Sequence, residues 1–214
     1  MVHRRAVPPG IEIQALRAAS ALHQLHRRSD GPEPVGLMEI RTARLLLRRP
    51  RPDDLEPLYS IMSNPLAMRY WSTLPHANTD VTRIWLDAKL ARNAAGGEDF
   101  LIVYEGKVIG EVGASRLPEF GFILHPDFWG RGMAYEAASA FLSHAFSTTN
   151  TPEVTADVDP RNHASLDLLA RLGFVETGRA ARTFLLGDEW CDSVYLRLAR
   201  PSGPSDMFTK PHSP

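Results

Sequence analysis

The chain has 214 residues, of which 43% are hydrophobic, and its formal net charge is −1 at pH 7. This length and composition suit one sizeable domain with a core of its own, and the nearly balanced charge argues against a protein that binds nucleic acid. The single cysteine, Cys191, excludes an internal disulfide and a zinc site built on several cysteines, and no apolar run approaches the roughly 20 residues that span a bilayer.

Three segments differ in composition and define the expected domain boundaries. Residues 1–37 contain five arginines and no lysine, and we expect a loosely ordered extension or a short helix there. The same composition also resembles an organelle transit peptide, and translation from Met38 is a further alternative. Residues 38–200 form the expected domain. The tail 201–214 contains four prolines and no apolar periodicity, which predicts disorder. We expect a cytoplasmic protein that contacts no membrane.

The first part of the domain predicts one strand followed by two helices. Thr42–Arg48 has the composition of a strand, which two prolines then end. A helix is expected from Asp53 to about Ser63, since acidic residues in its first turn favour the helix dipole. A second helix begins at Asn78 or Thr79. Its apolar residues share one face at helical spacing: Val81, Ile84, Trp85 and Ala88.

The second part of the domain predicts three strands, a helix, a strand, a helix and two strands. A glycine-containing turn joins the first two of these strands into a hairpin. The expected strands are Phe100–Tyr104, Val108–Ala114, Phe120–Leu124, Val154–Val158, a run from Phe174 through Leu186, and Ser193–Leu198. The first of the two helices has an apolar stripe from Ala134 to Ala145, and the second presents Ala164, Leu168 and Leu172 on one face. The order predicts a mixed α/β sheet.

A glycine pair lies where a predicted strand leads into a predicted helix. Gly130-Arg131-Gly132 allows the backbone to approach a bulky ligand, and the N–H groups of the following first helical turn have no partners within the helix. These groups and the helix dipole form an anion site, to which Arg131 can add a charge. The pattern lacks the Gly-Lys-Ser/Thr of a Walker loop. On its own it is also typical of an ordinary loop.

Several separated motifs give the glycine pair a context. The runs HPDFWGRGMAYEA (125–137) and VDPRNHASLDLLARLGF (158–174), with TARLLLRRPRPDDLEPLY (42–59) and MRYWS (68–72), resemble the GNAT superfamily of N-acetyltransferases. The branch they resemble most is that of the ribosomal-protein N-terminal acetyltransferases. The resemblance covers about residues 38–200. It implies a mixed α/β fold: a mostly antiparallel, centrally splayed sheet flanked by about four helices.

The resemblance also implies acetyl-CoA as co-substrate and no metal. In this family the loop after the fourth strand binds the pyrophosphate through main-chain N–H groups; here that loop is Trp129, Gly130, Arg131, Gly132, Met133 and Ala134. The preceding strand pairs with the pantetheine arm, which here implies Phe122, Ile123 and Leu124. Asn162 matches a family asparagine that contacts the cofactor or orders its loop. A helix N-cap is the compatible alternative for Asn162.

For catalysis, the resemblance implies direct attack of a neutral amine on the thioester. Glu119 matches a family base, with Glu111 as a rival on the neighbouring strand. Ser165 matches a residue that some members use as the acid, because the usual tyrosine position is Leu169 here. An ordinary helical serine is the alternative for Ser165.

The expected acceptor is a primary amine, either a small molecule or a protein N-terminus, and we expect a monomer or homodimer. Tyr70 and Trp71 are predicted to line the acceptor pocket, although core packing is equally typical of such aromatic residues. Because the usual acid is absent at Leu169, a regulatory module that binds acyl-CoA without turnover is the alternative function.

Overall fold

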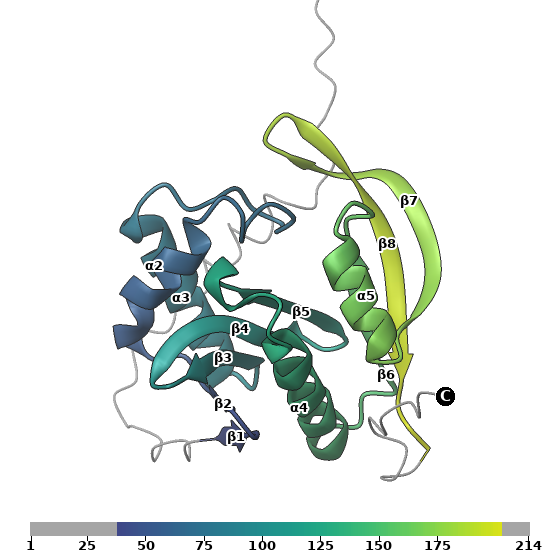
Figure 1. Cartoon of the computed structure of the whole chain (residues 1–214), viewed down its shortest axis with the longest axis horizontal. Helices are drawn as coiled ribbons and strands as arrows, with labels where there is room; N and C mark the ends of the chain where they lie inside the picture. The colour runs from purple at the N-terminus through teal and green to yellow at the C-terminus, as the bar shows by residue number, and fades with distance from the viewer. Residues whose placement is uncertain (1–37, 203–214) are drawn as a thin grey trace, which may run out of the picture. The chain divides into compact units, whose positions relative to one another are not determined.

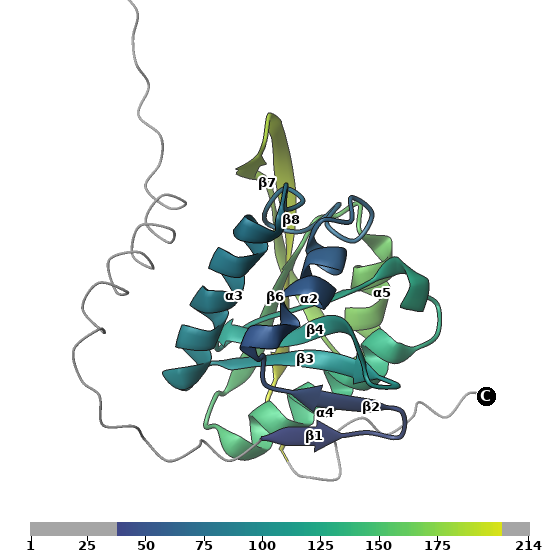
Figure 2. The ribbon, with the colours of Figure 1, turned by 90° about the vertical axis from the view of Figure 1, so that its left-hand side faces the viewer.

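The computed structural model describes residues 38–202 (Figures 1 and 2). The expected extension 1–37 and the tail from residue 203 onward lie outside the described residues. The strands are β1 (Glu39–Arg41), β2 (Leu45–Arg48), β3 (Glu98–Tyr104), β4 (Lys107–Arg116), β5 (Glu119–Leu124), β6 (Glu153–Val158), β7 (Val175–Leu186) and β8 (Glu189–Ala199). The helices are η1 (Pro52–Asp54), α2 (Leu55–Met62), α3 (Thr79–Ala94), η2 (Pro126–Phe128), α4 (Met133–Thr148) and α5 (His163–Arg171). None of the described helices is both long enough and apolar enough to cross a bilayer.

Eight strands form one sheet in the order β1-β2-β3-β4-β5-β6-β8-β7. Every neighbouring pair is antiparallel except β5 and β6, which run parallel. These two strands are paired at a single position, Glu119 opposite Thr155, and their ribbons diverge beyond it (Figure 1). The expected mixed, mostly antiparallel and centrally splayed sheet is therefore confirmed.

Two pairs of helices cover opposite faces of the sheet (Figures 1 and 2). The main core lies under α4 and α5, and includes alternate residues of the central strands: Phe120 and Leu124 of β5, Val154, Ala156 and Val158 of β6, and Val194 and Leu196 of β8. Because side chains alternate along a strand, the residues between these point to the other face. Ile123 does so, and packs with Ile61, Met62 and Met68. We call this second face, which α2 and α3 cover, the α2–α3 face.

The strand predicted at Thr42–Arg48 is confirmed only for Leu45–Arg48 (β2), because the chain makes a hairpin turn at residues 42–44. The Thr42 N–H donates to the Leu45 carbonyl at 2.9 Å, and the Leu45 N–H donates to Thr42 Oγ1 at 2.8 Å. These two bonds close a turn and separate β1 from β2. The extra strand β1 begins before the apolar run on which the prediction was based.

The apolar stripe predicted on the second helix faces the core only in part: Trp85 packs against the buried residues, whereas Val81 is exposed. Ile84 is 72% exposed, and the buried residues of α3 are Thr82, Leu86 and Lys89. The reason is an ion cluster between α3 and the sheet. Lys89 Nζ lies 2.8 Å from Asp99 Oδ1 of β3 and 3.2 Å from Glu111 Oε2 of β4. A pair of buried carboxylates needs a cation nearby, so the face of α3 that carries Lys89 is turned toward the sheet.

The buried face of the last helix is shifted relative to the prediction, although Leu168 and Leu172 pack against the main core as expected. Ala164, which was expected on the apolar face of α5, is exposed, whereas Leu169 is buried in the main core together with Leu172. The buried face of α5 is therefore offset from the predicted one. Leu169 has no access to the ligand-binding side of the helix because it is fully packed.

Replacing Lys89 by methionine is expected to destabilise the fold by about 3–5 kcal/mol at pH 7, since two buried carboxylates lose their cation. Burial raises the pKa of Glu111, while Lys89 opposes this increase. Removing Lys89 therefore raises the pKa of Glu111 further, and the loss of stability is smaller at pH 5 than at pH 7 because a larger fraction of this carboxyl carries a proton at the lower pH. Denaturant unfolding at both pH values measures this. Lys107→Met, on the exposed β3–β4 turn, is the control and should change little.

Candidate active site

The predicted pyrophosphate loop forms an uncapped helix N-terminus. The chain leaves β5, passes through η2 and enters α4 after Gly132, which is the N-cap residue with φ of 73°. Gly130 is also left-handed, at φ of 72°, and a Cβ there would meet no atom within 4 Å. No side chain caps α4, so its first N–H groups are available to a ligand. Open space over a helix N-terminus fits a phosphate group.

A clamp that the sequence did not indicate holds this loop from the β1–β2 turn. Arg44 donates to the Arg131 carbonyl at 3.0 Å and, through Nε, to Glu136 Oε2 at 2.7 Å. Thr42 Oγ1 donates to Glu136 Oε1 at 2.6 Å. Burial alone would raise the pKa of Glu136, but the hydrogen bonds from Thr42 and Arg44 outweigh burial and lower it. The clamp therefore works with an ionised Glu136 in the first turn of α4.

The single bridge between β5 and β6 leaves unpaired strand edges, which we call the β5–β6 fork: residues 120–124 on one side and 156–158 on the other. The His125 N–H donates to the Ile109 carbonyl of β4 at 2.8 Å. Hydrogen-bonded pairs alternate along an antiparallel ladder, so the backbone of Ile123 also faces β4. Phe122 and Leu124 direct their N–H and C=O groups into the fork.

Trp129 lies next to the fork and uses one of these groups. Its indole Nε1 donates to the Leu124 carbonyl at 2.9 Å, while half of the residue (50%) stays exposed. Trp129 therefore connects the phosphate loop to the end of β5. Both main-chain groups of Phe122 and the N–H of Leu124 remain for a ligand that runs along β5. Such a ligand would pair with the strand edge as another strand does.

At the start of α5, the structure shows the N-cap that was the alternative for Asn162. The Asn162 side chain accepts a hydrogen bond from the Ser165 N–H at 3.2 Å. Ser165 lies in the first turn of α5, just beyond the end of β6, and is half-buried. The two residues are therefore held together beside the fork, whatever ligand they contact.

On the α2–α3 face, the structure brings the predicted base and acceptor residues to one region. Glu119 is exposed at the closed end of the fork, and alternation places it on the same face as Gly121 and Ile123. Trp71 Cη2 lies 4.0 Å from where a Cβ on Gly121 would be. Tyr70 lies under the guanidinium of Arg161, 5.9 Å from the ring centroid. Glu119 and both aromatic residues thus border the same surface.

Other candidates from the sequence are engaged in the structure. Glu111, the rival base, is buried beside Lys89. His125 caps η2 by accepting the Asp127 N–H, and Cys191 is buried near Arg161. Within residues 38–202, no group of three His, Cys, Asp or Glu side chains is arranged to hold a metal ion.

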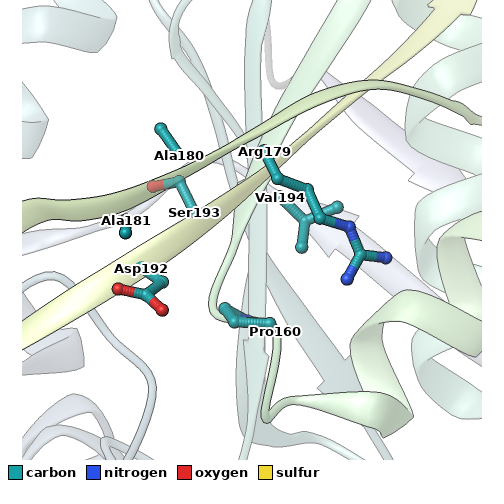
Figure 3. Close-up of a pocket in the computed structure, with 7 residues that line it drawn as sticks. All are labelled: Pro160, Arg179, Ala180, Ala181, Asp192, Ser193 and Val194. Carbon is teal, nitrogen blue, oxygen red and sulfur yellow. The ribbon is translucent and has the colours of Figure 1, made fainter.

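A cavity of about 290 Å³ lies apart from the phosphate loop (Figure 3). It opens between the turn after β6 and the β7–β8 ladder. The lining residues are Pro160, Arg179, Ala180, Ala181, Asp192, Ser193 and Val194. None of the predicted site residues lines it, so we do not assign the cavity to the donor or the acceptor.

Comparison with known proteins bears on this arrangement. The chain matches the family described as Acetyltransferase (GNAT) domain over residues 44–175. It is 29% identical to an uncharacterised N-acetyltransferase, p20, of Bacillus licheniformis over 146 residues, which is 64% of this chain and 82% of that protein. It is 23% identical to the spermidine N(1)-acetyltransferase of Escherichia coli over 172 residues, 74% and 91% of the two chains.

The fold has close structural relatives as well. The structure of RimL, the ribosomal L7/L12 α-N-protein acetyltransferase, in complex with coenzyme A superimposes with a TM-score of 0.69. The two chains are 17% identical, and the match covers 76% of this chain and 98% of RimL. This level of similarity shows a common fold.

We expect Gly130→Ala to cost about 1–2 kcal/mol of folding stability, because a side chain disfavours the left-handed conformation even where space is open. The same change should weaken coenzyme A binding, since the loop leaves its present conformation. Thermal unfolding and calorimetric titration with coenzyme A measure the two effects. Gly178→Ala is the control: Gly178 is also open but is not left-handed. Equal losses of stability and of coenzyme A affinity in the two variants would contradict the assignment of this loop as the pyrophosphate site.

We expect Glu136→Ala to lower the free energy of unfolding by about 1–2 kcal/mol at pH 7, because it removes charge-assisted hydrogen bonds. The lowered pKa means that this contribution is present above the ordinary glutamate pKa and is lost as the pH falls below it. Urea unfolding of wild type and variant at pH 7 and pH 4 tests whether the stabilisation by Glu136 decreases as the pH falls. Glu176→Ala, which breaks an exposed ion pair with Arg179, is the control and should change stability much less, because solvent screens the pair.

Proposed function

The chain belongs to the GNAT acetyltransferase family, and on this premise we propose that it transfers an acetyl group from acetyl-CoA to a primary amine by direct attack in a ternary complex. The observation that carries the proposal is the uncapped, doubly left-handed glycine turn at α4, placed beside the unpaired edge of β5. These two features provide, side by side, a site for a pyrophosphate and an edge for an extended amide-containing arm.

The donor would be held along the fork. Acetyl-CoA, when bound, supplies the acetyl group as an activated thioester. The N–H groups after Gly132 would bind the pyrophosphate, together with the loop from Trp129 to Ala134, while Arg44 keeps that loop in place through the Arg131 carbonyl. The edge of β5 would align the arm through the Leu124 N–H, which is nearer the loop. The Phe122 N–H, which points into the fork closer to Glu119, would stabilise the negative charge that develops on the carbonyl oxygen.

The acceptor amine has to lose a proton before it attacks. At pH 7 this costs about 4.6 kcal/mol for a lysine-like amine and about 1.4 kcal/mol for an α-amine. We propose that Glu119 takes this proton, directly or through water. Its support is its place on the α2–α3 face, at the closed end of the fork and next to the surface that Tyr70 and Trp71 border. Glu111 is less suited because Lys89 and the protein around it enclose its carboxylate.

The leaving thiolate would accept a hydrogen bond from the Ser165 hydroxyl and take up a proton that this hydroxyl relays from water, so that the serine regains its own proton. This serine lies beside the fork with its backbone fixed by Asn162. The family's usual tyrosine would occupy position 169, where Leu169 is instead packed in the core. Asn162 would act by orienting the first turn of α5 as its N-cap, so its part is positioning.

Two classes of acceptor are compatible with this site. Relatives of this chain are named for spermidine acetylation and for acetylation of ribosomal protein uS5, of which the latter matches only 38% of this chain at 33% identity. Both reactions use a primary amine. We propose that the acceptor of this chain belongs to the same chemical class and enters between Trp71 and the fork.

Glu119→Gln is expected to lower kcat by about 100-fold or more at neutral pH, since the amide cannot accept the proton. Its Kd for acetyl-CoA should stay within about twofold of wild type, because Glu119 lies off the phosphate loop. The assay is release of free thiol with a panel of primary amines. Glu105→Gln, on the exposed β3–β4 turn, is the matched control. Tight acetyl-CoA binding by wild type without thiol release from any amine would contradict an enzyme and favour a regulatory module.

A further inference from the structure

Asp157 of β6 lies beside the fork and has no basic partner among the described residues. Asp54 pairs with Arg48, Asp99 with Lys89, and other carboxylates likewise lie within 4.0 Å of a cation. Asp157 has no such ion pair within residues 38–202. Burial raises the pKa of Asp157, and the opposing influence is a hydrogen bond from the Ser193 hydroxyl. The side chain is nevertheless accessible to solvent. It is a partly desolvated carboxylate that a ligand can reach.

The strand pattern places Asp157 on the acceptor side of the sheet. Its neighbours Ala156 and Val158 point into the main core, so Asp157 points to the α2–α3 face. Thr155, two residues earlier on the same face, is paired with Glu119 across the closed end of the fork. Asp157 is therefore on the β6 side of the fork, roughly 7 Å along the strand from the level of Glu119.

The groups around Asp157 leave its charge uncompensated. Its directly opposite residue on β8 is Tyr195, whose ring is on the same face and 39% exposed. Ser193, the next residue on that face, is fixed by Thr183 Oγ1 at 2.7 Å. Across the fork the position level with Asp157 is Gly121, which has no side chain, and Glu119, two residues earlier on β5, is also acidic.

The nearest arginines on neighbouring segments are already engaged. Arg197 of β8 pairs with Glu153 at 3.3 Å. Arg161, in the turn after β6, donates to both Asp159 and Glu189. These two guanidinium groups are therefore already compensated, and for a cation that a ligand brings to Asp157 the exposed Tyr195 ring adds a favourable surface.

We propose that Asp157 and Tyr195 form a subsite for a second positive charge of the acceptor, so that the substrate is an aliphatic diamine or longer polyamine. The inference rests on the proposed function, because one amine must react beside Glu119 while the other is bound at Asp157. The separation of roughly 7 Å along the strand is one that a short aliphatic diamine spans. A protein N-terminus offers only the amine that reacts and would leave Asp157 without a partner.

The kinetic test compares two amines of equal chain length, 1,4-diaminobutane and n-butylamine, at saturating acetyl-CoA. The wild type is expected to have a KM at least about tenfold lower for the diamine, as one partly desolvated ion pair would produce. Asp157→Asn should remove this preference by raising the KM for the diamine, with kcat and the KM for butylamine within about twofold of wild type. Tyr195→Leu should shift the diamine KM in the same direction by a smaller factor. Asp167→Asn, an exposed acid on α5, is the control that should keep the preference.

Calorimetric binding of 1,4-diaminobutane to wild type and Asp157→Asn gives a readout that does not need turnover. A weaker Kd in the variant supports the subsite, and an equal Kd overturns it. An equal increase of KM for both amines in Asp157→Asn would also overturn the subsite. If Asp157→Asn instead lost kcat together with the acidic limb of the pH profile, Asp157 would be the proton acceptor, and the subsite would again be overturned. Diamine binding through Asp157 without any thiol release would contradict the proposed function alone. Turnover of both amines unaffected by Asp157→Asn would contradict this inference alone.

Discussion

The end of pairing between β5 and β6 is the constraint on which both halves of the candidate site depend. The Thr155 N–H donates to the Pro118 carbonyl at 2.8 Å, and Glu119 lies opposite Thr155. If the ladder continued, the main-chain groups of the two strands would satisfy each other. Because it stops, Phe122 and Leu124 keep unpaired main-chain groups on one edge, and Glu119 and Asp157 lie on the same face of the sheet at different levels along the two strands. One missing stretch of ladder thus leaves the edge and the surface to which we assign the donor and the acceptor in our proposal.

Charged side chains divide into two groups around this fork. Lys89, Arg44 and Arg161 each join segments that are distant in sequence, through Asp99, Glu136 and Glu189. Their carboxylates are compensated, so they contribute to the fold and the loop geometry. Glu119 and Asp157 have no such partner among the described residues and lie where a substrate would meet them. The arrangement fits a site that binds positively charged amines and takes a proton from one of them.

The donor loop could be predicted from the sequence because its signal is local. A glycine pair between a strand and an apolar helix specifies a left-handed turn and a free helix N-terminus within a few residues, and Gly130 and Gly132 have that conformation. The Arg44 clamp could not be predicted, since Arg44 and Glu136 are 92 residues apart and Arg44 precedes an apolar run that reads as a strand. The alternation of β6 does show that Asp157 points away from the core. It does not show which partners lie on that side.

The sequence alone determined the order and type of the strands and α-helices from β2 to β8, the glycine turn and the family, because periodicity, glycine conformation and motif spacing are properties of short segments. The tertiary structure alone decided which face of α3 is buried, where β5 and β6 separate, and that the backbone of Ile123 faces β4 while that of Leu124 faces the fork. Each of these depends on contacts between residues far apart in the chain. A buried ion cluster overrides the apolar stripe of α3, and the register with β4 sets the direction of every main-chain group of β5.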